Sequence, residues 1–94
     1  MTLCKLLIVD DDQWLLESMS QWLREQNYAV TCAINVAQAQ RLSQKESHDL
    51  CLIDISLEGP DGFALLKWCR KHHGAMPVVM MTGYAGPDAG AEAV

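Results

Sequence analysis

The chain alternates short apolar runs with segments in which apolar residues recur at helical spacing. The runs occupy residues 5–9, 28–33, 49–53 and 78–81, and most of them contain few polar positions. Continuous apolar runs that lack an alternation of polar and apolar residues are typical of strands covered on both faces, as in a parallel sheet. The sequence therefore predicts four strands at these places.

The segments between the runs have the period of helices. The first has one apolar stripe at i, i+4, i+7 and i+8, formed by Leu15, Met19, Trp22 and Leu23. Asp12 is placed to cap this helix and Asn27 to end it, while Asn35 is placed to cap a second helix through Lys45. A third helix is expected from Phe63 to Gly74. Residues 87–94 are expected to open a fourth.

This order of elements predicts the fold class. Strands that alternate with helices form parallel sheets with right-handed crossovers, and the helices cover both faces. Ligands of such α/β sheets bind beyond the carboxyl ends of the strands. Polar residues follow three of the predicted strands at that edge: Asp10 and Asp11, then Asp54, then Thr82. We expect these side chains, distant in sequence, to lie close together.

The predicted cluster suits one kind of chemistry. Neighbouring carboxylates raise one another's proton affinity unless a positive charge lies between them. Mg²⁺ fits a few carboxylate ligands completed by water. A carboxylate beside such an ion can act as a nucleophile toward a phosphoryl group and form an aspartyl phosphate. The Thr82 hydroxyl is then expected to hydrogen-bond the phosphoryl oxygens.

Composition narrows the function classes. The net charge of −5 argues against contact with nucleic-acid phosphates by this segment. No apolar run approaches the roughly 20 residues that span a bilayer, and no signal-peptide layout begins the chain, so a cytoplasmic protein without membrane contact is expected. The four cysteines contain no Cys-x-x-Cys pair, and those within apolar runs are expected to pack as small hydrophobes.

Three motifs resemble the response-regulator receiver family. They are Leu-Ile-Val-Asp-Asp-Asp at 7–12, Leu-Ile-Asp at 52–54 with Gly-Pro-Asp-Gly at 59–62, and Pro-Val-Val-Met-Met-Thr-Gly at 77–83. The resemblance covers the whole chain, with 43 residues from Asp11 to Asp54 and 28 from Asp54 to Thr82. It implies a flavodoxin-like, doubly wound parallel sheet with the strand order 2-1-3-4-5.

The resemblance also implies a role for each matching residue. Asp54 would be the phosphoacceptor, Asp11 a direct Mg²⁺ ligand, and Asp10 an acidic neighbour that reaches the metal through water. The backbone carbonyl of Ser56 would complete the protein ligands. The remaining residues would form the phosphoryl contact and the switch: Thr82, Gly83 and Tyr84. Asp12 is interpreted as a helix cap rather than a ligand.

The sequence departs from the family pattern in two respects. Glu58 stands where the family usually has proline, and Pro60 follows two places later. The family's lysine, fifth strand and last helix would lie beyond residue 94, so residues 1–94 are interpreted as a partial receiver domain. Loss of that neighbouring helix is expected to expose Trp14 or Trp22. A swapped or edge-paired dimer is an alternative way to cover the open fourth strand.

The predicted function is a switch rather than a conventional enzyme. The resemblance implies phosphoryl transfer from a sensor histidine kinase or a phosphotransfer protein, and an output domain following residue 94. Two alternatives stay open. The first is a receiver-like interaction module that carries no phosphate. The second is a haloacid-dehalogenase-type phosphohydrolase, in which Asp10 would be the nucleophile and Asp12 the general acid.

Overall fold

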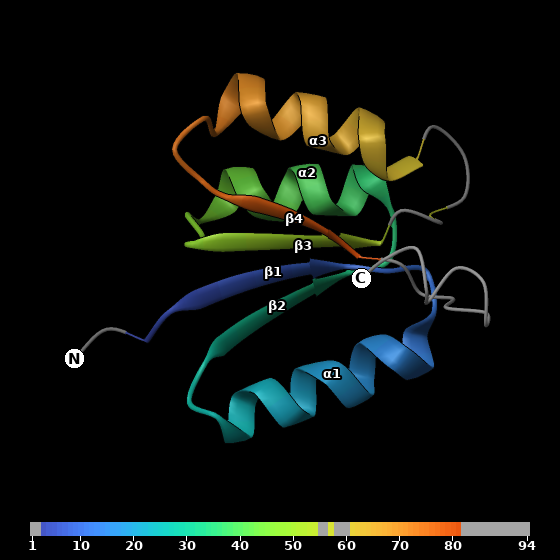
Figure 1. Ribbon diagram of the computed structural model, residues 1–94, viewed down its shortest axis with the longest axis vertical. Coiled ribbons are helices and arrows are strands. Elements are labelled where there is room, and N and C mark those ends of the chain that lie inside the picture. The colour runs from blue at the N-terminus through green and yellow to red at the C-terminus, as the bar shows by residue number, and fades with distance from the viewer. Residues whose placement is uncertain (1–2, 55–56, 58–60, 82–94) are drawn as a thin grey trace, which may run out of the picture.

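The computed structural model describes residues 3–54, 57 and 61–81 of the chain. Strands and helices alternate along it as the sequence predicts, and the helices lie on both sides of one sheet (Figure 1). The elements are β1 (Lys5–Val9), α1 (Gln13–Glu25), β2 (Ala29–Ala33), α2 (Val36–Lys45), β3 (Leu50–Asp54), α3 (Asp61–His72) and β4 (Val78–Met81).

The four strands are all parallel and lie in the order β2-β1-β3-β4. The predicted doubly wound, flavodoxin-like α/β fold is therefore confirmed. Val9 at the end of β1 pairs with Ile53 on β3, and Asp54 pairs with Met81 on β4. The carboxyl ends of three strands are thus brought to one edge of the sheet.

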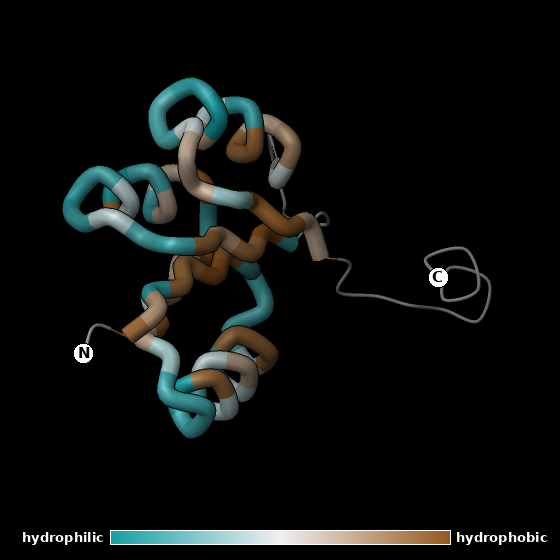
Figure 2. The backbone as a smooth tube through the Cα atoms, turned by 60° about the vertical axis from the view of Figure 1, so that its left-hand side comes forward, coloured by the Kyte–Doolittle hydropathy of each residue, from teal (hydrophilic) through white to brown (hydrophobic). Residues whose placement is uncertain are grey.

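The main core lies between the sheet and the two helices α2 and α3. Because side chains alternate between the faces of a strand, every second residue of β1 and β3 points into this layer. Leu7, Val9, Cys51 and Ile53 are each at most 1% exposed, and Leu65 of α3 packs with them. The tube representation shows the apolar strands at the centre and the polar helix segments outside (Figure 2).

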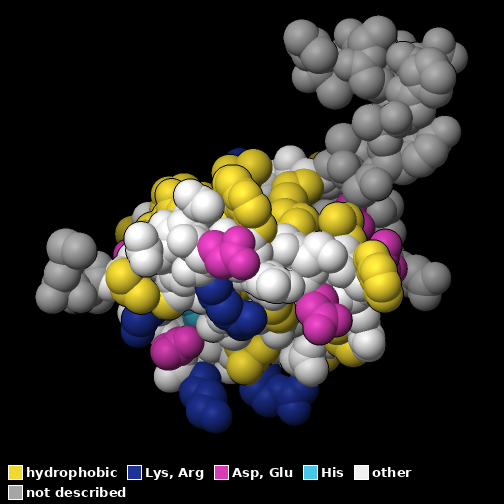
Figure 3. Space-filling model, turned by 90° about the horizontal axis from the view of Figure 1, so that it is seen from below, with side chains coloured by type: hydrophobic (Ala, Val, Ile, Leu, Met, Phe, Trp, Pro, Cys, Tyr) yellow, Lys and Arg dark blue, Asp and Glu magenta, His cyan; other side chains and the backbone are white. Residues whose placement is uncertain are grey.

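The opposite face of the sheet carries α1 (Figure 1). Its predicted apolar stripe is only partly correct, because Leu16 is buried whereas Trp22 is 59% exposed. Trp14 is 82% exposed, so both of these tryptophans are exposed, as the sequence suggested for at least one of them. Seen from the side of α1, hydrophobic side chains gather at the surface beside charged ones (Figure 3).

The helix ends follow the sequence closely. The Asp12 carboxylate accepts from the backbone N–H groups of Trp14 and Leu15, at 3.1 and 3.2 Å, and so caps α1. The Asn35 side chain caps α2 in the same way. Asn27 has a φ of 71°, a left-handed conformation that asparagine tolerates, and α1 ends just before it. Helix α3 begins at Asp61, two residues earlier than expected.

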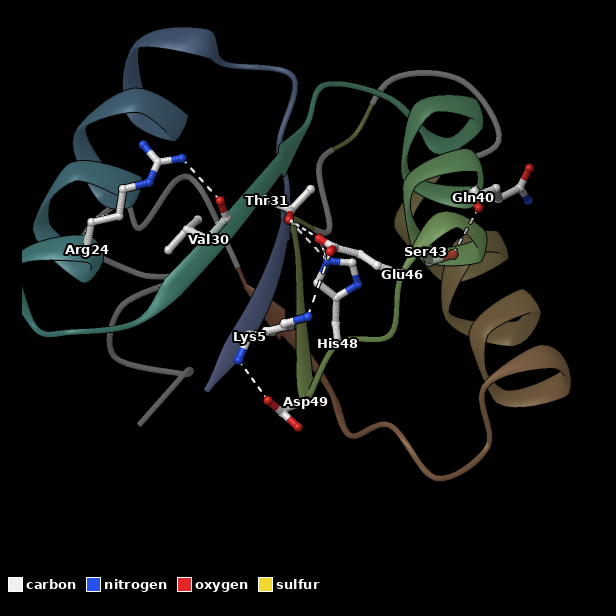
Figure 4. A network of polar contacts seen from close by, with 9 residues as sticks. All are labelled: Lys5, Arg24, Val30, Thr31, Gln40, Ser43, Glu46, His48 and Asp49. Atoms are coloured by element: carbon white, nitrogen blue, oxygen red, sulfur yellow. Dashed lines mark hydrogen bonds and ion pairs between the residues drawn. The ribbon is translucent and has the colours of Figure 1, made fainter. Parts of the chain in front are cut away.

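A polar network joins the amino-terminal ends of the strands (Figure 4). The side chain of His48 is 1% exposed, and its Nε2 lies 3.1 Å from Thr31 Oγ1 and 3.5 Å from Glu46 Oε1. Lys5 pairs with Glu46 at 3.8 Å, and its backbone N–H donates to the Asp49 carboxylate at 2.7 Å. This end of the sheet is opposite to the edge where the polar residues were predicted to converge.

Candidate functional site

Three carboxylates meet at the carboxyl edge of the sheet. Asp10 and Asp11 directly follow β1, and Asp54 is the last residue of β3, the strand that pairs with β1. One oxygen of each side chain lies within 4.8 Å of the others. The predicted convergence of Asp10, Asp11 and Asp54 is therefore observed.

The three carboxylates differ in their exposure to solvent. Asp10 is 1% exposed and Asp54 is 3% exposed, whereas Asp11 is exposed. Aspartates are rarely buried to this extent unless they are paired or bind a cation. The cluster thus has two buried oxygen donors at its base and one carboxylate open to water.

Asp10 is held in place through one oxygen, and its other oxygen is buried without a partner. Its Oδ1 accepts the backbone N–H of Asp12 at 2.9 Å, and its own N–H donates to the carbonyl of Ala33 at 3.0 Å. Its Oδ2 has no hydrogen-bond partner among the residues that the structure describes. An unsatisfied buried carboxylate oxygen is costly, so it indicates a place for a cation or a donor.

The electrostatics of the cluster point the same way. Burial raises the pKa of the Asp10 carboxyl, and the neighbouring charges of Asp54 and Asp11 raise it further. The hydrogen bond from the Asp12 backbone opposes this shift of the pKa without overcoming it. Negative charge at Asp10 is therefore disfavoured unless positive charge is supplied.

A hard divalent cation fits this donor set. The donors are all carboxylate oxygens, and Asp11 leaves one side open for the waters that Mg²⁺ retains. Asp10, Asp11 and Asp54 are the residues of the described chain that would hold it.

Helix α3 approaches the site more closely than the sequence predicts. A Cβ built at Gly62 would lie 2.8 Å from the backbone oxygen of Asp54 and 2.8 Å from Cγ2 of Ile53. Contacts this short are not tolerated, so only glycine fits without movement of the strand end. Gly62 belongs to the motif at 59–62, but a glycine in a turn-rich segment does not by itself reveal such a contact.

Asp12 has a structural role at the edge of the cluster. Its carboxylate caps α1, and it is not among the three residues whose oxygens converge. A phosphohydrolase using Asp10 and Asp12 would leave the buried Asp54 beside Asp10 unexplained. The geometry therefore favours a site built on Asp10, Asp11 and Asp54.

The remaining predicted site residues are Ser56, Thr82, Gly83 and Tyr84. They lie outside the described residues, as does the helix expected over residues 87–94. Their roles stay predictions. Among the described helices, none has the length and apolar character needed to cross a membrane.

Comparison with protein families gives a match over most of the chain. Residues 6–94 match the response regulator receiver domain. The chain is 31% identical over 90 residues to the alginate biosynthesis transcriptional regulatory protein AlgB of Pseudomonas syringae pv. tomato, covering 96% of the chain and 20% of that protein. It is 35% identical over 95 residues to the transcriptional regulatory protein PmrA of Pectobacterium parmentieri, covering 94% of the chain and 43% of that protein. The chain thus spans less than half the length of these curated relatives.

Solved structures show the same likeness. A CheY-like response regulator receiver domain protein from Methanospirillum hungatei JF-1 has a TM-score of 0.84 and 33% identity, covering 96% of the chain and 72% of that structure. The response regulator TrrA of Thermotoga maritima, solved in complex with Mg(2+)-BeF, has a TM-score of 0.82 and 25% identity. Here the alignment covers 88% of the chain and 72% of the solved one.

Proposed function

The chain belongs to the response regulator receiver domain family, whose members are phosphorylation-controlled switches rather than conventional enzymes, and we propose that Asp54 is its phosphoacceptor. The donor would be the phosphohistidine of a sensor histidine kinase or of a phosphotransfer protein. The observation that carries this proposal is the buried pair Asp10 and Asp54 beside the exposed Asp11, with Asp10 Oδ2 unpartnered among the described residues.

In the proposed reaction a carboxylate oxygen of Asp54 attacks the phosphorus atom of the donor. The new O–P bond forms as the N–P bond to the donor histidine breaks, and the electron pair of that bond returns to the imidazole nitrogen. The product is an acyl phosphate on Asp54 and a free histidine. Asp54 suits this role because it ends a strand at the open edge of the sheet.

Mg²⁺ would neutralise charge on the carboxylates and the transferring phosphoryl group. We assign Asp11 as a direct ligand and Asp10 as the acidic neighbour that reaches the ion through water, with the carbonyl of Ser56 as a further ligand. The complex of the Thermotoga maritima relative with Mg(2+)-BeF supports this cofactor. The close packing of Gly62 on the Asp54 backbone keeps the nucleophile in position.

Thr82 would then bind the phosphoryl oxygens, and Gly83 would leave room for them. Tyr84 would be the switch residue, whose change of position on phosphorylation alters the surface that binds a partner. Both curated relatives described above are longer regulatory proteins, so we further propose that an output domain follows this segment.

The test uses a chain that continues through the lysine expected beyond residue 94. It is incubated with acetyl phosphate and Mg²⁺, and its intact mass is recorded at once because acyl phosphates hydrolyse. We expect a mass gain of one phosphoryl group in the wild type and none in Asp54→Asn. Asp49→Asn is the matched control, because Asp49 precedes the same strand at its other end and contacts the Lys5 backbone.

An equal mass gain in Asp54→Asn would overturn the assignment of the nucleophile. Phosphate mapped to Asp10 would favour the phosphohydrolase alternative. If neither the wild type nor any variant gains mass, and the protein still binds its partner, then this protein is an interaction module that carries no phosphate.

A further inference from the structure

The basic side chains of the protein are concentrated on two neighbouring helices. Helices α2 and α3 contain five of the seven lysine and arginine residues: Arg41, Lys45, Lys67, Arg70 and Lys71. All five are exposed, and together they are called the basic surface below. The same two helices contain a single acidic residue, Asp61, at the opposite end of α3. The basic surface therefore carries charge of one sign on a protein whose net charge is −5.

The fold brings these five residues together at one end of the molecule. Helices α2 and α3 contact each other on the same face of the sheet (Figure 1). They turn Ala39 and Leu65 toward the strands, so their exposed sides face away from the sheet. The two basic residues of α2 are four positions apart, as are Lys67 and Lys71, and each pair forms one stripe. Because both helices return the chain to the amino-terminal ends of the strands, the two stripes lie at the same end.

Ion pairs do not neutralise the basic surface. None of its five residues forms an ion pair with another described residue. Glu46 directly follows α2, but its carboxylate pairs with Lys5 at 3.8 Å. Helix α1 differs in this respect, because its sequence combines two glutamates with Arg24. Interspersed charges of both signs produce little net field, whereas a surface of one sign attracts ligands of the opposite charge.

The helix dipole accounts for only part of this arrangement. Cations in the last turn of a helix are stabilised by the partial negative charge of its carboxyl end. This effect covers Lys45, Arg70 and Lys71, which lie in the last turns of their helices. Arg41 and Lys67 come before those turns, where the effect has faded. The basic surface thus extends further along both helices than their stability requires.

We propose that the basic surface docks a short acidic segment, rich in aspartate and glutamate, of a partner protein. Charge complementarity supports this occupant, and the arginine side chains can hold carboxylates through two parallel hydrogen bonds. The size of the surface fits a short segment, since Arg41 and Lys45 are separated by about 6 Å along α2. An extended polyanion such as DNA would also pass the acidic remainder of the protein, which exposes Asp11 and Asp12. A short acidic segment avoids that repulsion.

The basic surface is separate from the carboxylate cluster. Helix α3 approaches the cluster at Gly62, next to the backbone of Asp54. Arg70 lies about 12 Å further along the helix axis. Exposed charges separated by more than about 8 Å are largely screened at physiological ionic strength. A segment docked on the basic surface therefore leaves Asp54 open, and its binding does not depend on phosphorylation.

The test uses the same extended chain as the phosphorylation assay, without a phosphoryl donor. The probe is a fluorescein-labelled oligoglutamate peptide, and its binding is followed by fluorescence anisotropy at increasing NaCl concentrations. We expect binding at low salt that weakens as the salt concentration rises. Lys67→Gln/Lys71→Gln should weaken binding roughly fivefold or more, because two ion pairs with the peptide are lost. Asp54→Asn should bind as the wild type does, so this test is independent of the phosphoacceptor assignment.

Ser18→Glu/Gln21→Glu is the matched control, because it changes the net charge equally but on the exposed side of α1. This variant should keep most of the binding. Equal weakening in both double variants would overturn the proposal, since net charge and not the basic surface would then determine binding. Absence of peptide binding at low salt would also overturn it. Tighter binding of a DNA duplex, or of vesicles of phosphatidylcholine and phosphatidylglycerol, than of the peptide would overturn the choice of an acidic protein segment.

Discussion

The backbone oxygen of Asp54 lies only 2.8 Å from the position that a Cβ would take on Gly62. The Cβ built on Gly62 would also lie 2.8 Å from Ile53 Cγ2 and 3.1 Å from the end of the Met80 side chain. The methionine end can move, but the strand backbone cannot do so without disturbing the sheet. The first turn of α3 therefore fixes the position of the strand end that carries the proposed phosphoacceptor.

We expect Gly62→Ala to destabilise the protein by about 1–3 kcal/mol, because one added methyl group overpacks the junction of α3 and β3. Urea unfolding followed by circular dichroism measures this change in the free energy of unfolding. Gly74→Ala is the matched control, because its Cβ would meet only Arg70 O, at 3.3 Å. If Gly62→Ala loses no more free energy of unfolding than Gly74→Ala does, then the end of β3 can shift to accommodate the added methyl group.

Asp12 is expected to contribute to stability and not to metal binding. Asp12→Ala removes the acceptor for two backbone N–H groups at the start of α1 and should cost about 1 kcal/mol. Asp12→Asn keeps a capping oxygen and should retain most of that stability. The Mg²⁺ concentration at half saturation, followed by tryptophan fluorescence, should change little in both variants. A large shift of that concentration would assign Asp12 to the metal site.

The fold was largely predictable because the apolar runs, the helical periodicity and the capping residues all indicated the same order of strands and helices. Apolar runs located the four strands, while Asp12 and Asn35 were correctly identified as caps. The convergence of Asp10, Asp11 and Asp54 followed from one rule, that parallel strands bring their carboxyl ends to the same edge.

The features that were missed depend on distances between elements, which periodicity does not encode. The apolar stripe of α1 placed Trp22 toward the sheet, yet Leu16 takes the buried position because the helix is rotated relative to that stripe. The approach of Gly62 to Asp54 depends on how closely α3 packs on β3. Only the assembled layers fix that spacing.

Mg²⁺ should stabilise the protein through the carboxylate cluster. At a hundredfold excess over the dissociation constant, binding to the folded state alone adds about 2.7 kcal/mol. We expect Asp10→Asn to unfold at a higher temperature than the wild type without Mg²⁺, because the substitution removes a buried charge next to Asp54. The same variant should gain much less stability when Mg²⁺ is added.

Thermal unfolding with Mg²⁺ and with a chelator measures both effects. Asp49→Asn lies at the opposite end of the sheet and should respond to Mg²⁺ as the wild type does. If Mg²⁺ raises the unfolding temperature of Asp10→Asn as much as that of the wild type, then Asp10 is not part of the metal site. Asp11 and Asp54 would then be its ligands.

His48 is expected to make the stability depend on pH. Its ring lies between the strand ends with Nδ1 buried and without a partner in the described part of the chain (Figure 4). Burial lowers the pKa of His48, and the charges of Lys5 and His73 act in the same direction, against the raising effects of Glu46 and Asp49. The unfolded chain therefore takes up a proton at a higher pH than the folded protein does.

The pKa of His48 is lower in the folded state than its ordinary value of 6.5. Above pH 6.5 the contribution of His48 to stability is therefore complete. It is lost as the pH falls from 6.5 toward the pKa of His48 in the folded protein. Urea unfolding between about pH 8 and about pH 5 covers this window. His48→Gln should flatten the loss, since glutamine takes up no proton in this range. His72→Gln, at the exposed end of α3, should keep the wild-type dependence. An unchanged dependence in His48→Gln would place the responsible proton on another group.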